Sequence, residues 1–183
     1  MIKKIIIIFV LLASFLYAQS KDDLMKLYDD KNYRKACIMA ANLYQKYRND
    51  EEFLTVFAHS CLEVDMINRT ILPIIKLHKT PKSRENAAYF ATVLYQKKLL
   101  YHALIDDVDI SYVNLPKTKY ILSIIFNKFV SGDYEYKNGA YWFSDDDNSK
   151  LSYKLSAETH QKAEKLFLRT YKDGKITKVR TYW

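Results

Sequence analysis

A segment of aromatic, polar and basic residues recurs along the chain at a nearly constant distance, and this recurrence constrains the fold more than any other feature. The clearest pair is Tyr28–Ala36 and Tyr95–Ala103, and weaker copies lie at Leu62–Thr70, Phe129–Lys137 and Tyr171–Val179. The steps between the ends of successive copies are nearly equal, except for a longer last step. A period of about 34 residues is typical of stacked helical hairpins, in which no unit buries its apolar face alone. The recurrence therefore predicts a scaffold, and it indicates no particular chemistry.

The composition also favours long helices with short connections. The 183 residues include three Gly and three Pro, whereas sandwiches and barrels normally need more turn residues. Apolar residues recur at helical spacing, as at Phe53, Phe57 and Cys61. We expect a mainly α fold, an α-solenoid of antiparallel helix pairs forming a helical repeat region over residues 19–131. The expected helices cover about 21–30, 32–48, 50–64, 67–78, 82–97, 99–107 and 117–130.

Three short signals indicate where helices begin. Asn49, with Glu52 three residues later, has the pattern of an N-cap with a capping box. Pro81, which follows Thr80, and Pro116 are each expected near the first helical position, where the missing backbone N–H costs little.

The chain changes character after residue 131, and we expect residues 132–183 to form an aromatic region that packs on the repeats. Asn138–Gly139 separates two aromatic, roughly alternating runs. An Asn-Gly pair in this setting is the strongest short-range signal for a hairpin. The sequence therefore predicts a small β-hairpin near residues 133–143.

The rest of this region has two interpretations. Ser144–Ser149 is expected to be a loop and helix start, and residues 157–172 are expected to form another helix that ends at Asp173–Gly174. The apolar face of that helix would contain Ala163, Leu166, Phe167 and Thr170. The alternative is a β-hairpin that pairs 165–171 with 175–182, since the tail is rich in β-branched and aromatic residues and is a possible C-terminal strand.

The N-terminus has the pattern of an export signal. Lys3 and Lys4 precede Ile5–Ala18, an unbroken run of apolar and small residues. This run is too short to cross about 30 Å of hydrocarbon comfortably and suits the core of a signal peptide at residues 1–18. We expect a periplasmic or secreted protein with no stable membrane span after signal removal, and an uncleaved N-terminal anchor is the alternative.

The charge distribution argues against a nucleic-acid partner. The formal net charge is +8 at pH 7, but basic and acidic residues are interspersed and no dense Lys/Arg block is present. A nucleic-acid footprint would gather basic residues on one segment or face.

Two cysteines, Cys37 and Cys61, favour a disulfide. They lie equally far from Asn49 along the chain, one on each side, so in an antiparallel hairpin both sit at the same height along their helices. Small residues such as Ala36 and Ala40 allow the close approach, within about 7 Å between Cα atoms, that a disulfide needs. Export to an oxidising compartment favours the bond, and two buried free thiols are the alternative.

The sequence predicts no metal site and no cofactor. Asp145–Asp147 suggests a calcium loop, but Lys150 and Ser156 stand where the Gly and Glu of that motif belong. An acidic helix N-terminus is the simpler interpretation. No His has a second ligand at zinc-motif spacing; the four are His59, His78, His102 and His160. No constellation for acid–base or nucleophilic catalysis is recognisable.

The repeated segment resembles the turn of tetratricopeptide repeats and, more loosely, of Sel1-like repeats, written roughly Gly-x-Tyr-x-x-Ala. Tyr33 and Ala36 match its aromatic and small positions, and Gly132 and Tyr134 match its Gly and aromatic. In the copy that contains Gly132 and Tyr134, Lys137 stands where Ala is expected. A small residue there lets two helices approach closely.

This resemblance implies that the first helix of each unit lines a concave groove. The groove positions of the second unit correspond to Glu52, Thr55, His59, Leu62 and Glu63. Those of the third correspond to Glu85, Ala88, Thr92, Tyr95 and Gln96, and those of the fourth to Lys119, Leu122, Phe126 and Phe129. From these, the candidate binding residues are His59, Glu63, Thr92, Tyr95 and Gln96.

A second candidate surface is the aromatic hairpin, with Tyr141 and Trp142 as its binding residues. Tyr134, Tyr136 and Phe143 lie beside them in the sequence. An exposed aromatic face is a usual anchor for a protein or a glycan. Packing of the hairpin over the end of the helices is the alternative.

Together these features predict a non-enzymatic scaffold or adaptor that binds another cell-envelope protein or peptide through a helical groove. The alternative function is a cell-wall glycan-binding module or an enzyme that acts in the envelope.

Overall fold

A computed structural model describes residues 20–183, and the predicted signal peptide lies outside the described residues. The helical part contains α2 (Lys21–Asp29), α3 (Tyr33–Tyr47), α4 (Glu51–Glu63), the 3-10 helix η1 (Ile67–Thr70), α5 (Ile71–Lys76), α6 (Pro81–Asp106) and α7 (Ile121–Val130). The strands are β1 (Glu135–Lys137), β2 (Ala140–Ser144), β3 (Leu151–His160), β4 (Ala163–Lys172) and β5 (Lys175–Tyr182). The prediction of a mainly α solenoid is wrong, because the chain folds into helices plus a five-stranded antiparallel sheet, an α+β fold.

The helix starts follow the capping chemistry, with two corrections. Pro81 occupies the first turn of α6 as predicted, and Thr80 caps this helix, its hydroxyl accepting from the Ser83 backbone N–H. The cap of α4 is Asp50 instead of Asn49, and its carboxylate accepts two backbone N–H groups at 3.1 Å. Pro116 does not open a helix, since α7 begins only at Ile121.

Helix α6 is one unbroken helix of 26 residues. The predicted break between residues 97 and 99 is therefore wrong, and the Tyr95–Ala103 copy lies inside this helix instead of at a turn. No Gly or Pro interrupts this stretch, and Phe90, Val93 and Leu100 are fully buried along it. Packing along one face therefore continues through the expected turn.

The C-terminal region is a meander, with strand order β1-β2-β3-β4-β5. The predicted hairpin at Asn138–Gly139 is confirmed. The helix predicted for 157–172 is wrong, because those residues form the end of β3 and all of β4. The alternative pairing of 165–171 with 175–182 is confirmed as β4–β5. In the segment 144–149, Ser144 ends β2 and the other residues lie in the β2–β3 loop, so this segment starts no helix.

Three tight turns connect the strands, and each has positive φ at both central residues. The turns are Asn138–Gly139 (φ 52° and 70°), Gln161–Lys162 (53° and 63°) and Asp173–Gly174 (49° and 74°). Two-residue hairpin turns of this geometry match the right-handed twist of strands. Asn-Gly and Asp-Gly adopt it readily, whereas Gln-Lys carries no such signal. This missing signal is one reason why the sequence did not predict the β3–β4 hairpin.

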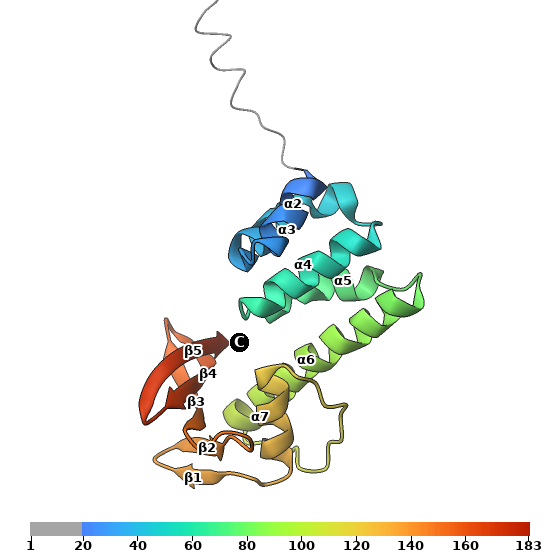
Figure 1. The fold of residues 1–183 in the computed structure, drawn as a ribbon. Coiled ribbons are helices and arrows are strands. Elements are labelled where there is room, and N and C mark those ends of the chain that lie inside the picture. Colours follow the sequence, from blue (N-terminus) through green and yellow to red (C-terminus); the bar gives the residue numbers. More distant parts are fainter. Residues whose placement is uncertain (1–19) are drawn as a thin grey trace, which may run out of the picture.

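The sheet packs on the helices through one face. Figure 1 shows α2 to α5 at one end, the sheet at the other, and α6 running between them. The inner face buries Tyr153, Leu155, Leu166, Leu168 and Tyr182, which join the helical core. Among the described residues, no helix covers the opposite, outer face of the sheet (Figure 1).

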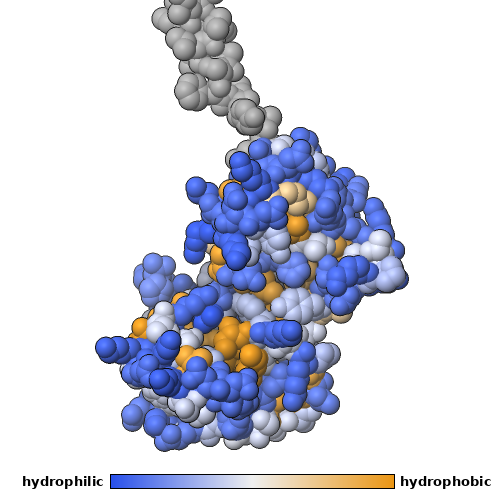
Figure 2. Space-filling model, in the orientation of Figure 1, coloured by the Kyte–Doolittle hydropathy of each residue, from blue (hydrophilic) through white to orange (hydrophobic). Residues whose placement is uncertain are grey.

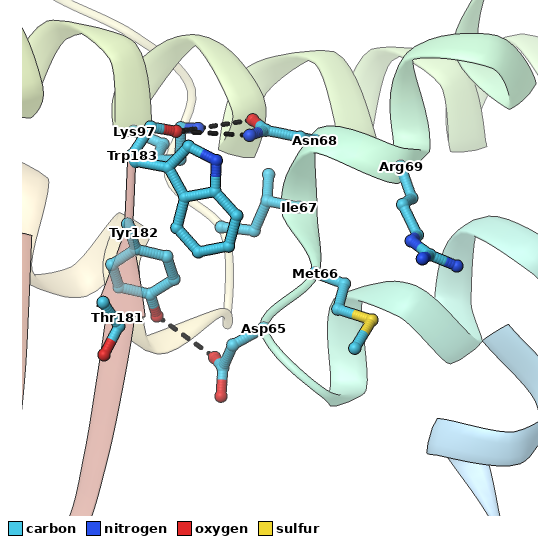
Figure 3. A pocket seen from close by; sticks show the side chains of 9 residues that line it. All are labelled: Asp65, Met66, Ile67, Asn68, Arg69, Lys97, Thr181, Tyr182 and Trp183. Carbon is cyan, nitrogen blue, oxygen red and sulfur yellow. Dashed lines mark hydrogen bonds between the residues drawn. The ribbon is translucent and has the colours of Figure 1, made fainter. Parts of the chain in front are cut away.

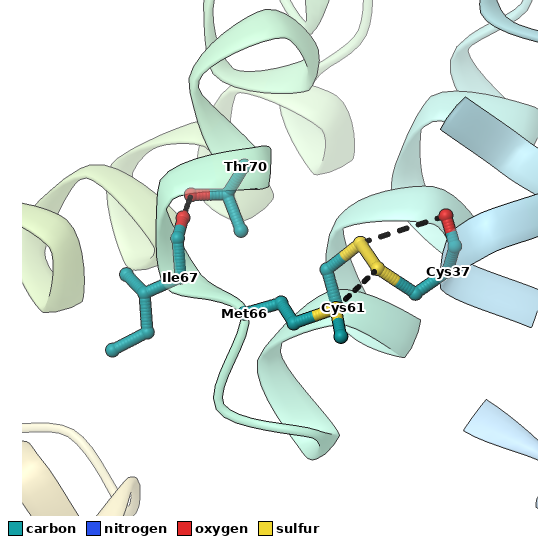
Figure 4. The surroundings of a disulfide bond; sticks show 5 residues. All are labelled: Cys37, Cys61, Met66, Ile67 and Thr70. Atoms are coloured by element: carbon teal, nitrogen blue, oxygen red, sulfur yellow. Dashed lines mark hydrogen bonds between the residues drawn. A yellow bond between two sulfur atoms is a disulfide. The ribbon is translucent and has the colours of Figure 1, made fainter. Parts of the chain in front are cut away.

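Cys37 and Cys61 form a disulfide between α3 and α4, which confirms the predicted pair (Figure 4). Their Cα atoms lie 4.8 Å apart, and both residues are fully buried. Ala36 and Ala40 are fully buried beside them, which fits the expected close helix contact. The bond is compatible with an oxidising, extracytoplasmic location.

Asp65, just after α4, joins the helices to the sheet. Its Oδ1 accepts from the hydroxyl of Tyr120 at 2.7 Å and from that of Tyr182 at 3.1 Å, and Arg180 Nε lies 3.4 Å away. Burial raises the pKa of both tyrosines, and the Asp65 charge raises it further. Both hydroxyls therefore stay protonated and donate to Asp65. Lys178 of β5 adds a weaker contact at 3.6 Å.

Within residues 20–183, the helices are too short or too polar to cross a membrane.

Candidate binding groove and sheet face

A shallow depression lies where α2, α4 and α6 meet, and we call it the helical groove. Its lining consists of Tyr28 from α2, Thr55, Val56 and His59 from α4, and Lys82, Glu85, Asn86 and Tyr89 from α6. These residues recur at threes and fours along α4 and α6, so each helix presents one side to the groove. Figure 2 shows one face of the molecule. Hydrophilic side chains cover most of this face, and apolar side chains gather toward its centre and beside the sheet.

The floor of the groove is neutral and able to form hydrogen bonds. His59 is half-buried, with its ring 4.8 Å from that of Phe90 and 6.2 Å from that of Tyr89. Burial lowers the pKa of His59, and the charge of Lys82 lowers it further. The imidazole is therefore neutral at neutral pH and offers one donor and one acceptor. Asn86 Nδ2 donates to Thr55 Oγ1 at 3.4 Å across the groove.

The rim of the groove is charged. Lys82 and Glu85 form an exposed ion pair at 2.9 Å. Glu63 is exposed near one end of the groove. Burial raises the pKa values of Tyr28 and Tyr89, and the nearby charge of Glu63 raises both values further. A neutral floor with charges of both signs at the rim suits a peptide segment better than a phosphate or another strongly charged ligand.

The structure brings only part of the predicted set together. Thr55, His59 and Glu85 line the groove. Tyr95 is 54% exposed but lies on another side of α6. Thr92 also lies outside the groove lining, and Gln96 is fully buried, where its Nε2 donates to the Pro116 carbonyl at 3.2 Å.

Sequence reasoning missed five lining residues: Val56, Tyr28, Lys82, Asn86 and Tyr89. The last three lie one helical turn or less from Glu85, so helical spacing on a correctly placed α6 would have found them. Tyr28 belongs to the first repeat, for which no groove positions were assigned.

The aromatic hairpin divides between the two faces of the sheet. Tyr141 faces inward, with its ring 4.9 Å from Phe129 of α7, 5.0 Å from Tyr134 and 4.8 Å from Tyr136. Successive residues of a strand point to opposite faces, so Trp142 lies on the outer face. Tyr141 and Trp142 therefore do not form one binding surface, and Tyr141 instead helps to hold the hairpin on α7.

Trp142 is the centre of an aromatic and basic cluster on the outer face. Its ring lies 5.3 Å from that of Tyr171, and Lys137 and Lys154 place their Nζ atoms 5.3 and 5.6 Å from its centroid. A polar hollow borders this cluster, and its lining includes Trp142, Glu135, Lys137, Ser144 and Ser152.

Glu158 and Arg169 form a bidentate ion pair on the outer face. Arg169 donates to the two carboxylate oxygens at 2.6 and 2.9 Å and also contacts Ser156 Oγ at 3.1 Å. The hydrogen bonds from Arg169, with a further one from Ser156, lower the pKa of Glu158 to about 2. Such bidentate pairs fix both side chains in place.

Replacing Glu158 by Gln is expected to reduce the acid sensitivity of folding. Because the folded-state pKa is depressed, the stabilisation is fully present above the ordinary value of 4.5 and is lost as the pH falls toward 2. The side chain is 40% exposed, so solvent screening keeps this contribution below about 1 kcal/mol. Urea unfolding of wild type and Glu158→Gln at pH 7 and pH 3 measures it, with Glu63→Gln as the control. Equal acid losses in wild type and Glu158→Gln would contradict the assignment.

The acidic run Asp145–Asp147 lies in the β2–β3 loop, so its prediction as a helix N-terminus is wrong. Asp145 accepts from the Tyr153 hydroxyl at 2.6 Å, and Asp146 pairs with Lys128 Nζ at 2.6 Å. These carboxylates hold the loop on β3 and α7. Across residues 20–183, no group of three or more His, Cys, Asp or Glu side chains is arranged to hold a metal ion.

No family model, curated protein or solved structure matches this chain.

Proposed function

We propose that the protein is a non-enzymatic adaptor of the cell envelope, periplasmic or secreted, that binds a segment of another envelope protein in the helical groove. The observation that carries this proposal is the convergence of three helices on one shallow surface that contains aromatic, neutral and charged side chains. Its envelope location rests on the export pattern of residues 1–18 and on the Cys37–Cys61 disulfide.

The shape and chemistry of the groove favour a peptide over a small molecule. Small-molecule sites are usually enclosed, whereas this groove is shallow and combines Tyr28 and Tyr89 with the amide of Asn86 and the hydroxyl of Thr55. Aromatic side chains supply contact area, and the polar groups fix the register of a bound segment.

Blocking the groove is expected to abolish partner binding without unfolding the protein. Thr55→Arg places a long charged side chain over the floor, and Thr92→Arg is the matched control on α6 outside the groove. Both Thr side chains are half-buried on helices. In pull-downs from envelope extracts, we expect discrete protein partners with wild type and Thr92→Arg, reduced at least tenfold with Thr55→Arg, which corresponds to about 1.4 kcal/mol. Equal recovery by both variants would contradict the proposal.

The polar hollow beside Trp142 favours a second candidate function, binding of cell-wall glycan. Its lining combines the Trp142 indole with carboxylates, one amine and several hydroxyls, groups that can hydrogen-bond and stack on a neutral sugar. Co-sedimentation with purified wall polymer that is lost in Trp142→Ala, together with no protein partner in the pull-down, would favour this function over the first.

A further inference from the structure

Strand β5 is an open edge of the sheet. It has eight residues and pairs only with β4, so the backbone groups on its other side have no strand partner within residues 20–183. Lys175 to Val179 are all exposed, and Ile176 and Val179 are 53% and 49% exposed. An open edge of this length is a template for an added strand. The opposite edge, β1, has only three residues.

A pocket lies at the end of this edge, between β5 and η1 (Figure 3). Thr181, Tyr182 and Trp183 form one wall, Met66 to Arg69 form the other, and Asp65 and Lys97 complete the lining. The volume of about 170 Å³ accommodates one apolar side chain.

The pocket walls are held in place by hydrogen bonds. Lys97, which is 1% exposed, donates to Asn68 Oδ1 and to the Trp183 carbonyl, and Asn68 Nδ2 donates to the same carbonyl at 3.2 Å (Figure 3). On the other side, Tyr182 donates to Asp65. The pocket is therefore preformed, which lowers the entropic cost of filling it.

The charge of the edge selects among possible strands. Three of the eight β5 residues are basic and none is acidic: Lys175, Lys178 and Arg180. Arg180 is committed to Asp65, but Lys178 keeps a side chain that is 49% exposed. Arg69, at the pocket rim, is exposed and makes no ion pair within residues 20–183. A second copy of β5 would bring like charges together, whereas an acidic strand would be attracted.

We propose that the open edge of β5 binds an extended, acidic peptide segment as a sixth strand, with one bulky apolar side chain of that segment in the pocket between β5 and η1. Backbone hydrogen bonds to β5 supply the general affinity, and the pocket and Arg69 supply the selectivity. This site is separate from the helical groove and does not depend on it, so the adaptor has two places for partner segments.

The test uses a defined peptide, Thr-Val-Glu-Leu-Glu-Val-Thr with blocked ends, and amide hydrogen exchange followed by NMR. We expect saturable binding and slowed exchange in β5, with no change in β1. A peptide with N-methylated backbone, or with Lys in place of both Glu, is expected to bind at least tenfold more weakly. Arg69→Glu is expected to weaken binding of the acidic peptide about fivefold, while the control Arg48→Glu, also exposed, leaves it unchanged.

Three results would overturn the proposal. The first is absence of binding at millimolar peptide, and the second is binding that protects the helical groove but not β5. The third is protection of β5 that increases with protein concentration alone, which would assign the edge to a second copy of the chain. Because the groove variant Thr55→Arg retains β5, it is expected to bind this peptide normally, so failure of this site is distinguishable from failure of the groove.

Discussion

Replacing Cys37 and Cys61 together by Ala is expected to lower the free energy of unfolding by about 3 kcal/mol. The disulfide joins residues separated by 24 positions, and its main effect is to restrict the unfolded chain. For a chain of this length, the loss corresponds to a decrease in Tm of roughly 6–12 °C. Thermal unfolding of the oxidised wild type and of the double variant measures the difference.

Two controls separate the cross-link from the packing around it. Wild type in reductant keeps both sulfur atoms but loses the bond, so it is expected to unfold close to the double variant. Thiol titration of denatured protein isolated from the envelope is expected to find no free thiol. Two titratable thiols, or an unchanged Tm in the double variant, would contradict the structural role of the disulfide.

Replacing Asp65 by Ala is expected to destabilise the protein by about 2–4 kcal/mol. The carboxylate accepts from the half-buried Tyr120 and the buried Tyr182 and lies beside Arg180, so its loss leaves two hydroxyls without their acceptor and Arg180 without its counter-charge. Each buried donor left without a partner costs about 1–3 kcal/mol, and breaking a buried ion pair costs more. Urea unfolding at pH 7 provides the measurement.

The matched control for this change is Asp147→Ala, an exposed loop carboxylate that makes no side-chain hydrogen bond or ion pair within residues 20–183. It is expected to change stability by less than about 0.5 kcal/mol. Tyr120→Phe removes only one donor and is expected to cost about 1 kcal/mol. An Asp65→Ala variant as stable as the Asp147→Ala control would show that the sheet is held on the helices by apolar packing alone.

Most helices were predictable because their signals are local. Capping side chains, helical spacing and the absence of Gly and Pro identified α2, α3, α4 and the start of α6 within a few residues. The break in α6 was predicted from a repeated segment, and tertiary packing overrode it. A regular recurrence in the sequence shows that similar segments are present, but it does not require each of them to form a turn.

The sheet was only partly predictable, for a physical reason. Asn138–Gly139 and Asp173–Gly174 carry turn chemistry that is readable from the sequence, whereas Gln161–Lys162 does not. Leu166 and Leu168 both face inward, as the alternation of a strand requires. The spacing of Ala163, Leu166, Phe167 and Thr170 also fits a helix. Short apolar runs permit both interpretations, and the long-range pairing of β4 with its neighbours decides between them.

The candidate sites were likewise predictable only where their signals are local in the sequence. The disulfide was predictable from helix geometry, whereas His59 was assigned to a groove through the repeat resemblance. Tyr95 and Gln96 were assigned to the groove through the repeat resemblance, but Tyr95 lies on another side of α6 and Gln96 is buried. The pocket at the end of β5 was not predictable, because it joins residues more than a hundred positions apart, such as Asn68 and Trp183.

The most direct test of the adaptor proposal is photo-cross-linking in living cells. A photoreactive amino acid is placed at position 55 in the helical groove and, in a separate strain, at position 95 on another side of α6. The proposal predicts a discrete adduct with another envelope protein from position 55 and none from position 95. No adduct from position 55, or the same adducts from both positions, would contradict it.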